Sequence, residues 1–598
     1  MRKGIRLPWG NTLVTRTLFA VLLASIGIVS MGAQAARAQA PLEPSQLPQR
    51  TLFYLIWRGT PAPNERTANS LLALWDDPDF ASVRSALAAG MLASSDKQSS
   101  QPKLTPEELG DFASLLENSF TLGYIQDPRE RRSATGPAAA KPPTWDGMFF
   151  VYNRVGKEAI LAKAILRLRS AAKETPRISQ VTLAGLPVLK IESKTSSSFW
   201  AENGTYAVGA GEAEVMEEIL SRLENKSPQA ASLAQSATYQ ESQPVAGSGA
   251  LEFFLRVPDL KGLIPASNPG PFPVQKLLDA ARLDAVHSIA GHVTLDGART
   301  HVQAAILGDT TAGTPFDIWA NGQSAPASLA FAPAEAISYN VAHLNLLGIY
   351  GAVQRIAGAA FPTGPQGNAG LLDMMAQQRL GMPLSNALGL FTGEFASMQT
   401  SPSLDPAKQV FFFSIRNKPE TLKLLRALLG DRVASERNEG DATLLKISLS
   451  GNQTSAGVAQ WNFFQVAVTP EMVIAASSID TLRETLAYRA KALPTAGLAG
   501  VPQFQANRGT APANLIGLSY FDFQKVDWQA AKDHWLQDGK KPQIAKGVAG
   551  RGTTSTNPST IPDWVSQINV QALSRHLHTS WSVSWKDAKG IHWDQWIE

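Results

Sequence analysis

Residues 200–220, WAENGTYAVGAGEAEVMEEIL, combine an apolar strand, the glycines Gly209 and Gly211, and a helix. Nucleotide-binding proteins use this order of elements to hold a phosphate at a helix N-terminus. A dinucleotide site has the spacing G-x-G-x-x-G, but Glu214 stands here at the third glycine position. The Asn203-Gly204 pair before the strand predicts a tight hairpin rather than a parallel βαβ unit. The stretch therefore predicts a hairpin strand that leads into a helix, and no cofactor site.

The same order of elements recurs later in the chain, which indicates an internal repeat. Residues 186–220 resemble residues 442–486, with Ala475 and Ser477 at the positions of Gly209 and Gly211. Five more pairs of segments match in the same order along the chain: 47–55 with 332–340, 148–168 with 410–430, 233–241 with 498–506, 251–262 with 516–527, and 292–297 with 582–587. We therefore interpret residues 41–310 and 326–598 as two tandem homologous repeats, joined by a linker at 311–325.

Each repeat alternates strands, tight turns and helices. The Asp296-Gly297 pair lies between two strand-like segments and predicts a hairpin. Strands joined by short turns form antiparallel sheets. The predicted fold class is α+β, with each repeat forming a large, mainly antiparallel sheet and helices packed on one face of it.

The N-terminus has the pattern of a secretory signal peptide over residues 1–40. Basic residues precede the apolar run 17–31, and A-x-A sites allow cleavage after Ala35 or Ala40. We expect an exported protein, periplasmic or extracellular, with an uncleaved N-terminal membrane anchor as the alternative. No other segment predicts a transmembrane helix.

Composition excludes several classes of function. The 598 residues include no cysteine, which rules out disulfides, thiolate metal sites and cysteine nucleophiles. Residues 1–40 carry five basic and no acidic residues, so their removal takes the formal net charge from +4 to −1. The remaining charge gives no indication of nucleic-acid binding.

Catalytic signatures are weak. The sequence has no G-x-S-x-G, H-E-x-x-H or Walker A motif. Ser170 and Lys173 fit S-x-x-K, but no K-T-G follows them in the required order. We therefore predict no catalytic residue and no cofactor.

Histidines near the C-terminus are the only weak metal candidates. His576 and His578 would share one face of a strand, and His592 would lie on the next strand, where three such groups could bind zinc. The alternative is a polar, solvated strand face. The alignment of the repeats places His287, His292 and His301 of the first repeat out of register with these three.

Tryptophans also concentrate at the C-terminus. Trp581, Val583 and Trp585 alternate with serines and would share one strand face. A sugar-stacking platform is one interpretation, but Trp585 aligns with Leu295 of the first repeat, which favours core packing.

The start of each repeat carries a loose motif. Pro48, Thr51 and Tyr54 have the spacing P-x-x-T-x-x-Y, and Pro333 and Tyr339 repeat it with Ala336 replacing threonine. With the hairpin-to-helix stretch that follows, the chain resembles a family of uncharacterised exported bacterial proteins, a domain of unknown function with this duplicated layout. That family has no assigned catalytic residues, so the resemblance implies none here.

These observations favour an exported, non-catalytic protein that binds an apolar or peptide ligand or another envelope component. Two alternatives remain: an exported hydrolase, metal-dependent through His576, His578 and His592, and a structural protein of the cell envelope.

Overall fold

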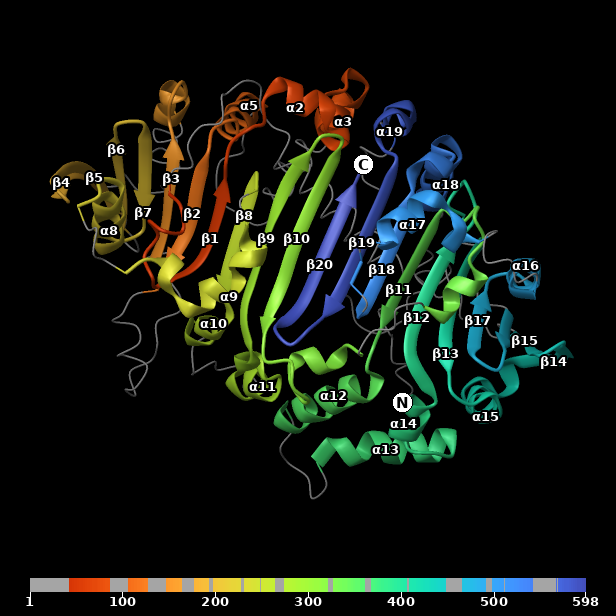
Figure 1. Cartoon of the computed structure of the whole chain (residues 1–598). Coiled ribbons are helices and arrows are strands. Elements are labelled where there is room, and N and C mark those ends of the chain that lie inside the picture. Colours follow the sequence, from red (N-terminus) through yellow and green to blue (C-terminus); the bar gives the residue numbers. More distant parts are fainter. Residues whose placement is uncertain are drawn as a thin grey trace, which may run out of the picture.

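The computed structural model describes residues 42–85, 106–126, 147–163, 177–192, 197–226, 231–247, 249–263, 274–320, 326–360, 367–405, 408–447, 465–490, 497–509, 511–512, 514–540, 566 and 568–598. The predicted signal peptide, residues 1–40, and the Ser170–Lys173 motif lie outside these residues. The described chain forms one twenty-stranded sheet with helices packed around it (Figure 1). The predicted α+β class and antiparallel sheet are therefore confirmed.

The strands divide into two groups of ten along the sequence. The first group is β1 (Thr51–Trp57), β2 (Phe120–Ile125), β3 (Met148–Asn153), β4 (Arg177–Leu183), β5 (Leu186–Glu192), β6 (Ser197–Asn203), β7 (Tyr206–Ala210), β8 (Leu251–Arg256), β9 (Val286–Asp296) and β10 (Arg299–Gly308). The second group is β11 (Ser338–His343), β12 (Phe391–Gln399), β13 (Gln409–Ile415), β14 (Val433–Glu439), β15 (Ala442–Ile447), β16 (Gln465–Val468), β17 (Met472–Ala476), β18 (Leu515–Asp522), β19 (Thr579–Lys586) and β20 (Gly590–Ile597).

Both groups have the same strand order from the outer edge of the sheet to its centre. The first runs β4-β5-β6-β7-β3-β2-β1-β8-β9-β10, with every neighbouring pair antiparallel. The second runs β14-β15-β16-β17-β13-β12-β11-β18-β19-β20, again with every pair antiparallel. Each strand of one half therefore has a counterpart at the same place in the other half.

The two halves meet at the β10–β20 pair. Gln303 pairs with Asp594 at its centre, and the pairs Thr300–Ile597 and Ile306–Ile591 lie three residues to either side. The register is therefore symmetric about the Gln303–Asp594 pair, and the sheet is continuous across the junction of the halves.

Residues 200–220 form the elements that the sequence predicted. The hairpin β6–β7 turns at Gly204, whose φ of +55° suits glycine, and two residues, Gly211 and Glu212, separate the end of β7 from the start of α8. Gly209 lies inside β7, between Phe150 of β3 and Trp200 of β6. Gly209 therefore belongs to a sheet strand and Gly211 to the short connection that follows it, and the prediction of a hairpin strand leading into a helix is confirmed.

Helices pack on both faces of the sheet. Their bounds are α2 (Pro63–Ala68), α3 (Ser70–Asp76), α5 (Pro106–Leu115), α8 (Ala213–Leu223), α9 (Ala237–Ala246), α10 (Val257–Leu263), α11 (Val274–Ala280), α12 (Leu346–Ala360), α13 (Gly367–Leu380), α14 (Leu384–Gly389), α15 (Lys418–Leu429), α16 (Ile479–Ala490), α17 (Pro502–Gly509), α18 (Trp528–Lys540) and α19 (Val570–His576). Across the described residues, no helix has both the length and the apolar character needed to cross a membrane.

The front face of the sheet, as seen in Figure 1, packs against α8, α9, α16 and α17. On the opposite face, Leu115 of α5 packs with Phe120 and Phe150, and Leu422 of α15 packs with Phe411. The prediction of helices on one face is therefore wrong. Its physical reason is visible in β13, where successive residues are apolar and both faces of the strand require cover.

Contacts at both ends of the strands also join the halves. At one end, Arg575 and His576 of α19 contact the buried carboxylate of Asp77, at 2.5 and 2.7 Å. At the other end, α11 packs against α12 (Figure 1). Residues 315–318 of the expected linker form a 3₁₀ turn, η5 (Pro315–Ile318), with Phe316 buried beside Val257 and Val286. The same turn packs against α12 of the second half, and Asn345 Nδ2 donates a 3.0 Å hydrogen bond to Asp317 Oδ1, so this part of the linker contacts both halves.

Candidate functional site

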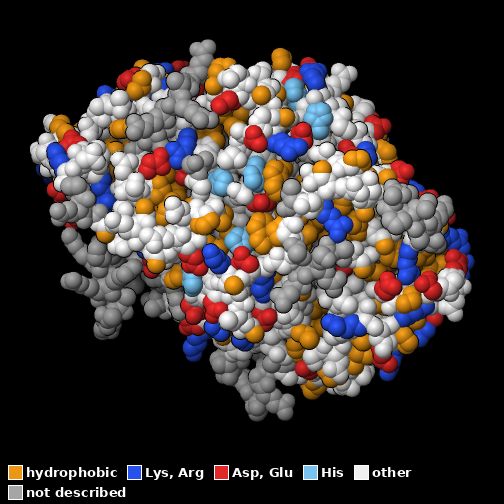
Figure 2. Space-filling view, in the orientation of Figure 1, with side chains coloured by type: hydrophobic (Ala, Val, Ile, Leu, Met, Phe, Trp, Pro, Cys, Tyr) orange, Lys and Arg blue, Asp and Glu red, His pale blue; other side chains and the backbone are white. Residues whose placement is uncertain are grey.

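A row of polar side chains crosses the centre of the front face on four adjacent strands. Glu252 of β8 pairs with His292 of β9, His292 pairs with Gln303 of β10, and Gln303 pairs with Asp594 of β20. Directly paired residues on one face of an antiparallel sheet have Cβ atoms about 4.5–5.5 Å apart. Figure 2 shows histidine side chains gathered over the middle of this face. Polar side chains are thus concentrated where the two halves join.

The β8 end of the row is buried, and its side chains are fully hydrogen-bonded. Glu252 is 1% exposed, and Arg58 Nη2 donates a 2.5 Å hydrogen bond to its Oε1. Arg58 also donates to Glu43 Oε1 at 2.7 Å and to the Gly249 carbonyl at 3.0 Å. Burial raises the pKa of Glu252 above its usual value, although the hydrogen bonds from Arg58 oppose the shift. We call Glu43, Arg58 and Glu252 the ion cluster, and its geometry suits a structural role.

His292 extends this paired region by one strand. Its Nδ1 donates a 2.6 Å hydrogen bond to the Val245 carbonyl of α9, and its ring is buried. The histidine therefore fixes α9 against β9, and its side chain is unavailable to a ligand.

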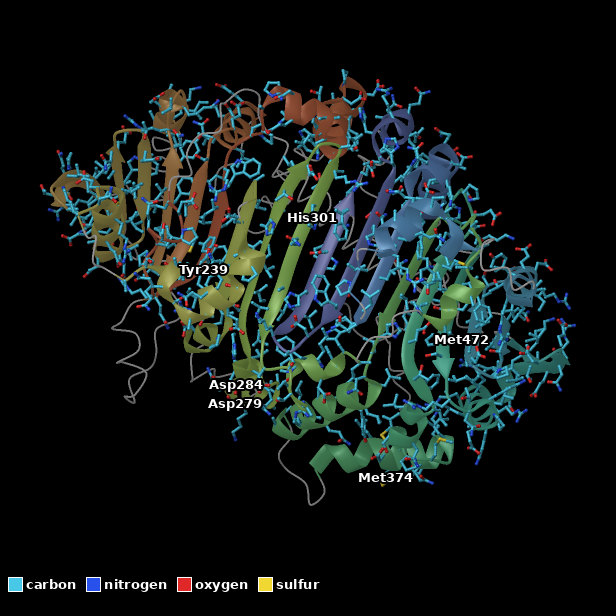
Figure 3. All side chains as sticks on the ribbon, viewed as in Figure 1. Tyr239, Asp279, Asp284, His301, Met374 and Met472 are labelled. Carbon is cyan, nitrogen blue, oxygen red and sulfur yellow. The ribbon has the colours of Figure 1, made fainter. Side chains whose placement is uncertain are left out.

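The end of the row at the β10–β20 pair lies among aromatic rings. The His301 and Trp596 rings stack with centroids 4.7 Å apart and planes 7° apart. The Trp585 and His592 rings stack at 5.0 Å and 11°. We call the six residues of this region the central strip: His301, Gln303, Trp585, His592, Asp594 and Trp596 (His301 is labelled in Figure 3).

The central strip is partly open to solvent and only loosely paired. The side chains of His301, His592 and Asp594 are 21%, 12% and 15% exposed. Asp594 Oδ1 lies 3.9 Å from His301 Nε2, which is beyond hydrogen-bond distance, and His592 Nε2 lies 3.1 Å from Asp587 Oδ2. The strip therefore combines a carboxylate with two imidazole–indole stacks that a ligand could contact at their edges.

The two stacked histidines occupy matching positions. His301 lies two residues before Gln303, and His592 lies two residues before Asp594. Gln303 and Asp594 are the central pair of the seam, the β10–β20 pair where the halves meet. The sequence alignment put the first-half histidines out of register with His592. For His301 that prediction is wrong, because the symmetric register of β10 and β20 makes His301 and His592 equivalent positions in the two halves.

The three metal candidates of the sequence do not converge. His576 is the last residue of α19 and contacts Asp77, and His578 is exposed ahead of β19, so neither lies on a strand. His592 lies beside Trp585, its partner on β19. Trp585 is six residues from Thr579, the first residue of β19, so His592 lies about 20 Å along the strand from the end of β19 that follows His578. Among the described residues, no group of three or more His, Asp or Glu side chains has the arrangement to hold a metal ion.

The C-terminal tryptophans divide between the core and the surface. Trp581 and Val583 are buried, and Trp581 packs edge-on against Phe504 at 5.1 Å. Trp585 lies on the same face and is partly buried at the margin of this cluster, as the alternation predicted. Core packing of Trp581 is therefore confirmed, while Trp585 reaches the central strip.

A second hollow lies between α18 and α19. It has a volume of about 570 Å³, is open to solvent, and is lined in part by Asp527, Trp528 and Arg575. Arg575 forms ion pairs with Asp77 and Asp79 of the first half. Arg575 of this hollow thus serves the contact between the halves, and Asp527 accepts a hydrogen bond from the Ala530 backbone N–H of α18, which makes the central strip the better candidate site.

Sequence reasoning missed the central strip because its members come from three separate strands. One signal was present: His592, Asp594 and Trp596 alternate along β20 and therefore share a face. The partner strand that brings His301 and Gln303 beside them lies about 290 residues earlier in the sequence.

Comparisons with protein-family models, with curated proteins and with solved structures give no match to this chain.

Proposed function

We propose that this chain is an exported, non-catalytic protein of the cell envelope that binds a ligand at the central strip. The observation that carries the proposal is the contrast along the polar row. Glu252 and His292 are buried and hydrogen-bonded, whereas Asp594 has no hydrogen-bond partner within the strip and is flanked by two partly exposed aromatic stacks. Export rests on the signal-peptide pattern of residues 1–40, with periplasm and extracellular space both open and an N-terminal anchor as the alternative.

The chemistry of the strip favours a ligand with two features. Trp585 and Trp596 offer apolar ring edges, and Asp594 accepts a hydrogen bond or a positive charge. An extended peptide with an apolar side chain beside a basic one supplies both features. A purely anionic ligand would meet an uncompensated carboxylate and is disfavoured.

We also interpret the two halves as tandem repeats of one α+β unit, at residues 41–310 and 326–598. The shared strand order, the symmetric β10–β20 register and the six matching sequence segments support this interpretation. In the resemblance given above, the same duplicated layout accompanies exported proteins. The seam between the repeats would then be the one place where each half presents the same strand edge to the other.

The metal-dependent hydrolase receives no support from the separation of His592 from His576 and His578. A role as a structural envelope protein has one observation in its favour. Five of the ten large apolar side chains that are exposed among the described residues lie on α12 and α13, including Met374 (Figure 3): Leu347, Val353, Ile356, Met374 and Met375. These two helices could contact another apolar component of the envelope.

Native mass spectrometry of protein purified from the periplasm, before and after incubation with an envelope extract, tests the binding proposal. We expect a bound species that Asp594→Asn weakens by about tenfold or more, because a charged hydrogen-bond acceptor is lost. Asp296→Asn is the matched control, since it removes an exposed carboxylate at a hairpin of the same sheet. A wild-type protein that stays empty in both preparations, or equal binding by the two variants, would overturn the proposal.

A further inference from the structure

The sheet has two outer edges, β4 and β14, at matching places in the strand order (Figure 1). Among the described residues, β4 pairs only with β5 and β14 pairs only with β15. Each strand ends at a two-residue turn, Ala184-Gly185 or Gly440-Asp441, so Leu183 and Glu439 occupy the same position. The outer side of an edge strand presents backbone donors and acceptors that another strand can pair with.

Charge protects one of these edges. β14 carries Glu436, Arg437 and Glu439 along its length, and Arg426 pairs with Glu436 at 2.6 Å while Arg483 pairs with Glu439 at 3.0 Å. Charged side chains on an edge strand oppose the addition of a further strand, because each must be desolvated or placed opposite another charge. β14 is thus protected against edge-to-edge association.

The other edge lacks this protection. β4 places Gln180, Val181 and Leu183 where β14 has Glu436, Arg437 and Glu439, and its only charged residue is Arg177 at its start. Ile178 is 41% exposed on this strand. Val181 and Leu183 pack against the core beside α8, so the strand is held in place by the first half. β4 is therefore an ordered, nearly uncharged edge.

The sequence of β4 is complementary to itself in antiparallel pairing. With two copies of Gln180 opposite each other, Ile178 faces Thr182, Ser179 faces Val181, and Arg177 faces Leu183, so no like charges meet. The same arrangement of β14 would place Glu436 opposite Glu436, which is destabilising. Self-pairing of one patch about a two-fold axis forms a closed dimer, whereas pairing β4 with β14 of another copy would produce an open filament.

We propose that β4 pairs with β4 of a second copy and extends the sheet through both molecules. The chain already contains an association of this kind, because the inner edges β10 and β20 pair antiparallel about the Gln303–Asp594 centre. The proposed dimer repeats that mode at the outer edge. It is independent of a ligand at the central strip.

Analytical ultracentrifugation of the full mature chain over a range of concentrations tests this proposal. We expect a concentration-dependent dimer for the wild type. Gln180→Glu places like charges opposite each other at the two-fold axis, and Ile178→Lys, as a separate variant, places a charge on the edge strand; each variant should weaken the dimer about fivefold or more. Ala434→Lys is the control, because residue 434 is exposed on β14 beside Val433, which pairs with Ile447 as Ile178 pairs with Ile191.

A charge-swap experiment identifies the pairing register. A mixture of Gln180→Glu and Gln180→Lys proteins should form a heterodimer at least as stable as the wild-type dimer, because opposite charges then meet at the centre. Four results would overturn the proposal: a wild-type protein that is monomeric at every concentration, open-ended filaments, equal weakening by Ala434→Lys, or no rescue in the mixture.

Discussion

The two halves of the sheet pack the same aromatic arrangement but surround it with different chemistry. In the first half, Tyr239 of α9 meets Phe254 of β8 with ring centroids 5.5 Å apart and planes at 73°. In the second half, Phe504 of α17 meets Tyr520 of β18 at 5.5 Å and 76°. Edge-to-face geometry of this kind is favourable for aromatic pairs. The matching distances and angles indicate that the shared backbone arrangement sets this contact.

The residues beside these pairs differ. Next to Phe254, Glu252 pairs with Ile56 and binds Arg58, whereas Leu518 pairs with Val341 at the same place in the second half. On the other side, Phe254 pairs with Ala290 through β8–β9, and Tyr520 pairs with Trp581 through β18–β19. One half thus fills the space around its aromatic pair with ions and a small residue, and the other with larger apolar groups. The same backbone accepts either solution.

The largest effect should come from breaking the ion cluster. Arg58→Met leaves the Glu252 carboxylate buried without its main partner, and we expect a loss of about 3–5 kcal/mol in the free energy of unfolding. The double variant Arg58→Met/Glu252→Leu places leucine where the second half has Leu518, and should regain most of that loss. Urea denaturation of the wild type and the three variants of this cycle measures both quantities.

The cycle has a clear opposing outcome. If the double variant is as unstable as Arg58→Met alone, the stability at this site depends on the packing of Arg58 and not on its pairing with Glu252. The first half would then be unable to adopt the apolar solution of the second.

A smaller effect should follow from removing the aromatic pair in each half. Phe504→Leu loses edge-on contacts with both Tyr520 and Trp581, and we expect a cost of about 2 kcal/mol. Tyr239→Leu loses one such contact, with Phe254, and a looser one with Tyr54 at 6.3 Å, so we expect about 1 kcal/mol. Thermal unfolding of the two variants side by side checks the order, and equal losses would mean that Trp581 adds nothing to the second half.

The local elements of the fold could be predicted from the sequence, but their assembly could not. The hairpin at Asn203-Gly204 and the following helix α8 depend on neighbouring residues, and both are confirmed. The β10–β20 seam joins strands about 290 residues apart, and neither strand carries a local signal for its partner. Its central pair, Gln303 and Asp594, shares no sequence feature that would reveal the contact.

A one-residue error in the alignment also hid the central strip. The comparison of 292–297 with 582–587 aligned Trp585 with Leu295. In the structure Trp585 pairs with His592 as Thr294 pairs with His301, so Trp585 is the equivalent of Thr294. Because side chains alternate between faces, a slip of one residue assigns a side chain to the wrong face of the sheet. The same slip separated His301 from His592.

The histidine pair of the sequence hypothesis failed for a different reason. His576 and His578 have the spacing of one strand face, but residues 570–576 form α19. The side chain of Asn569 accepts a hydrogen bond from the Gln571 backbone N–H and caps this helix. An asparagine N-cap was a readable signal in the sequence, and it outweighs the apparent alternation.

The smallest effect should be a pH dependence of stability at His343, the position in the second half that corresponds to Arg58 in the first. His343 at the end of β11 is the counterpart of Arg58, and it is buried opposite Glu394 of β12. Burial lowers the pKa of His343 below its usual value, although the charge of Glu394 opposes the shift. As pH falls below about 6.5, His343 becomes protonated in the unfolded chain before it does in the folded protein, so the free energy of unfolding decreases. We expect His343→Gln to reduce the loss of thermal stability between pH 7.5 and pH 5.5, by less than about 1.4 kcal/mol per pH unit. The exposed His578, changed to Gln, is the control, and an identical pH dependence in both variants would show that burial at position 343 has no such effect.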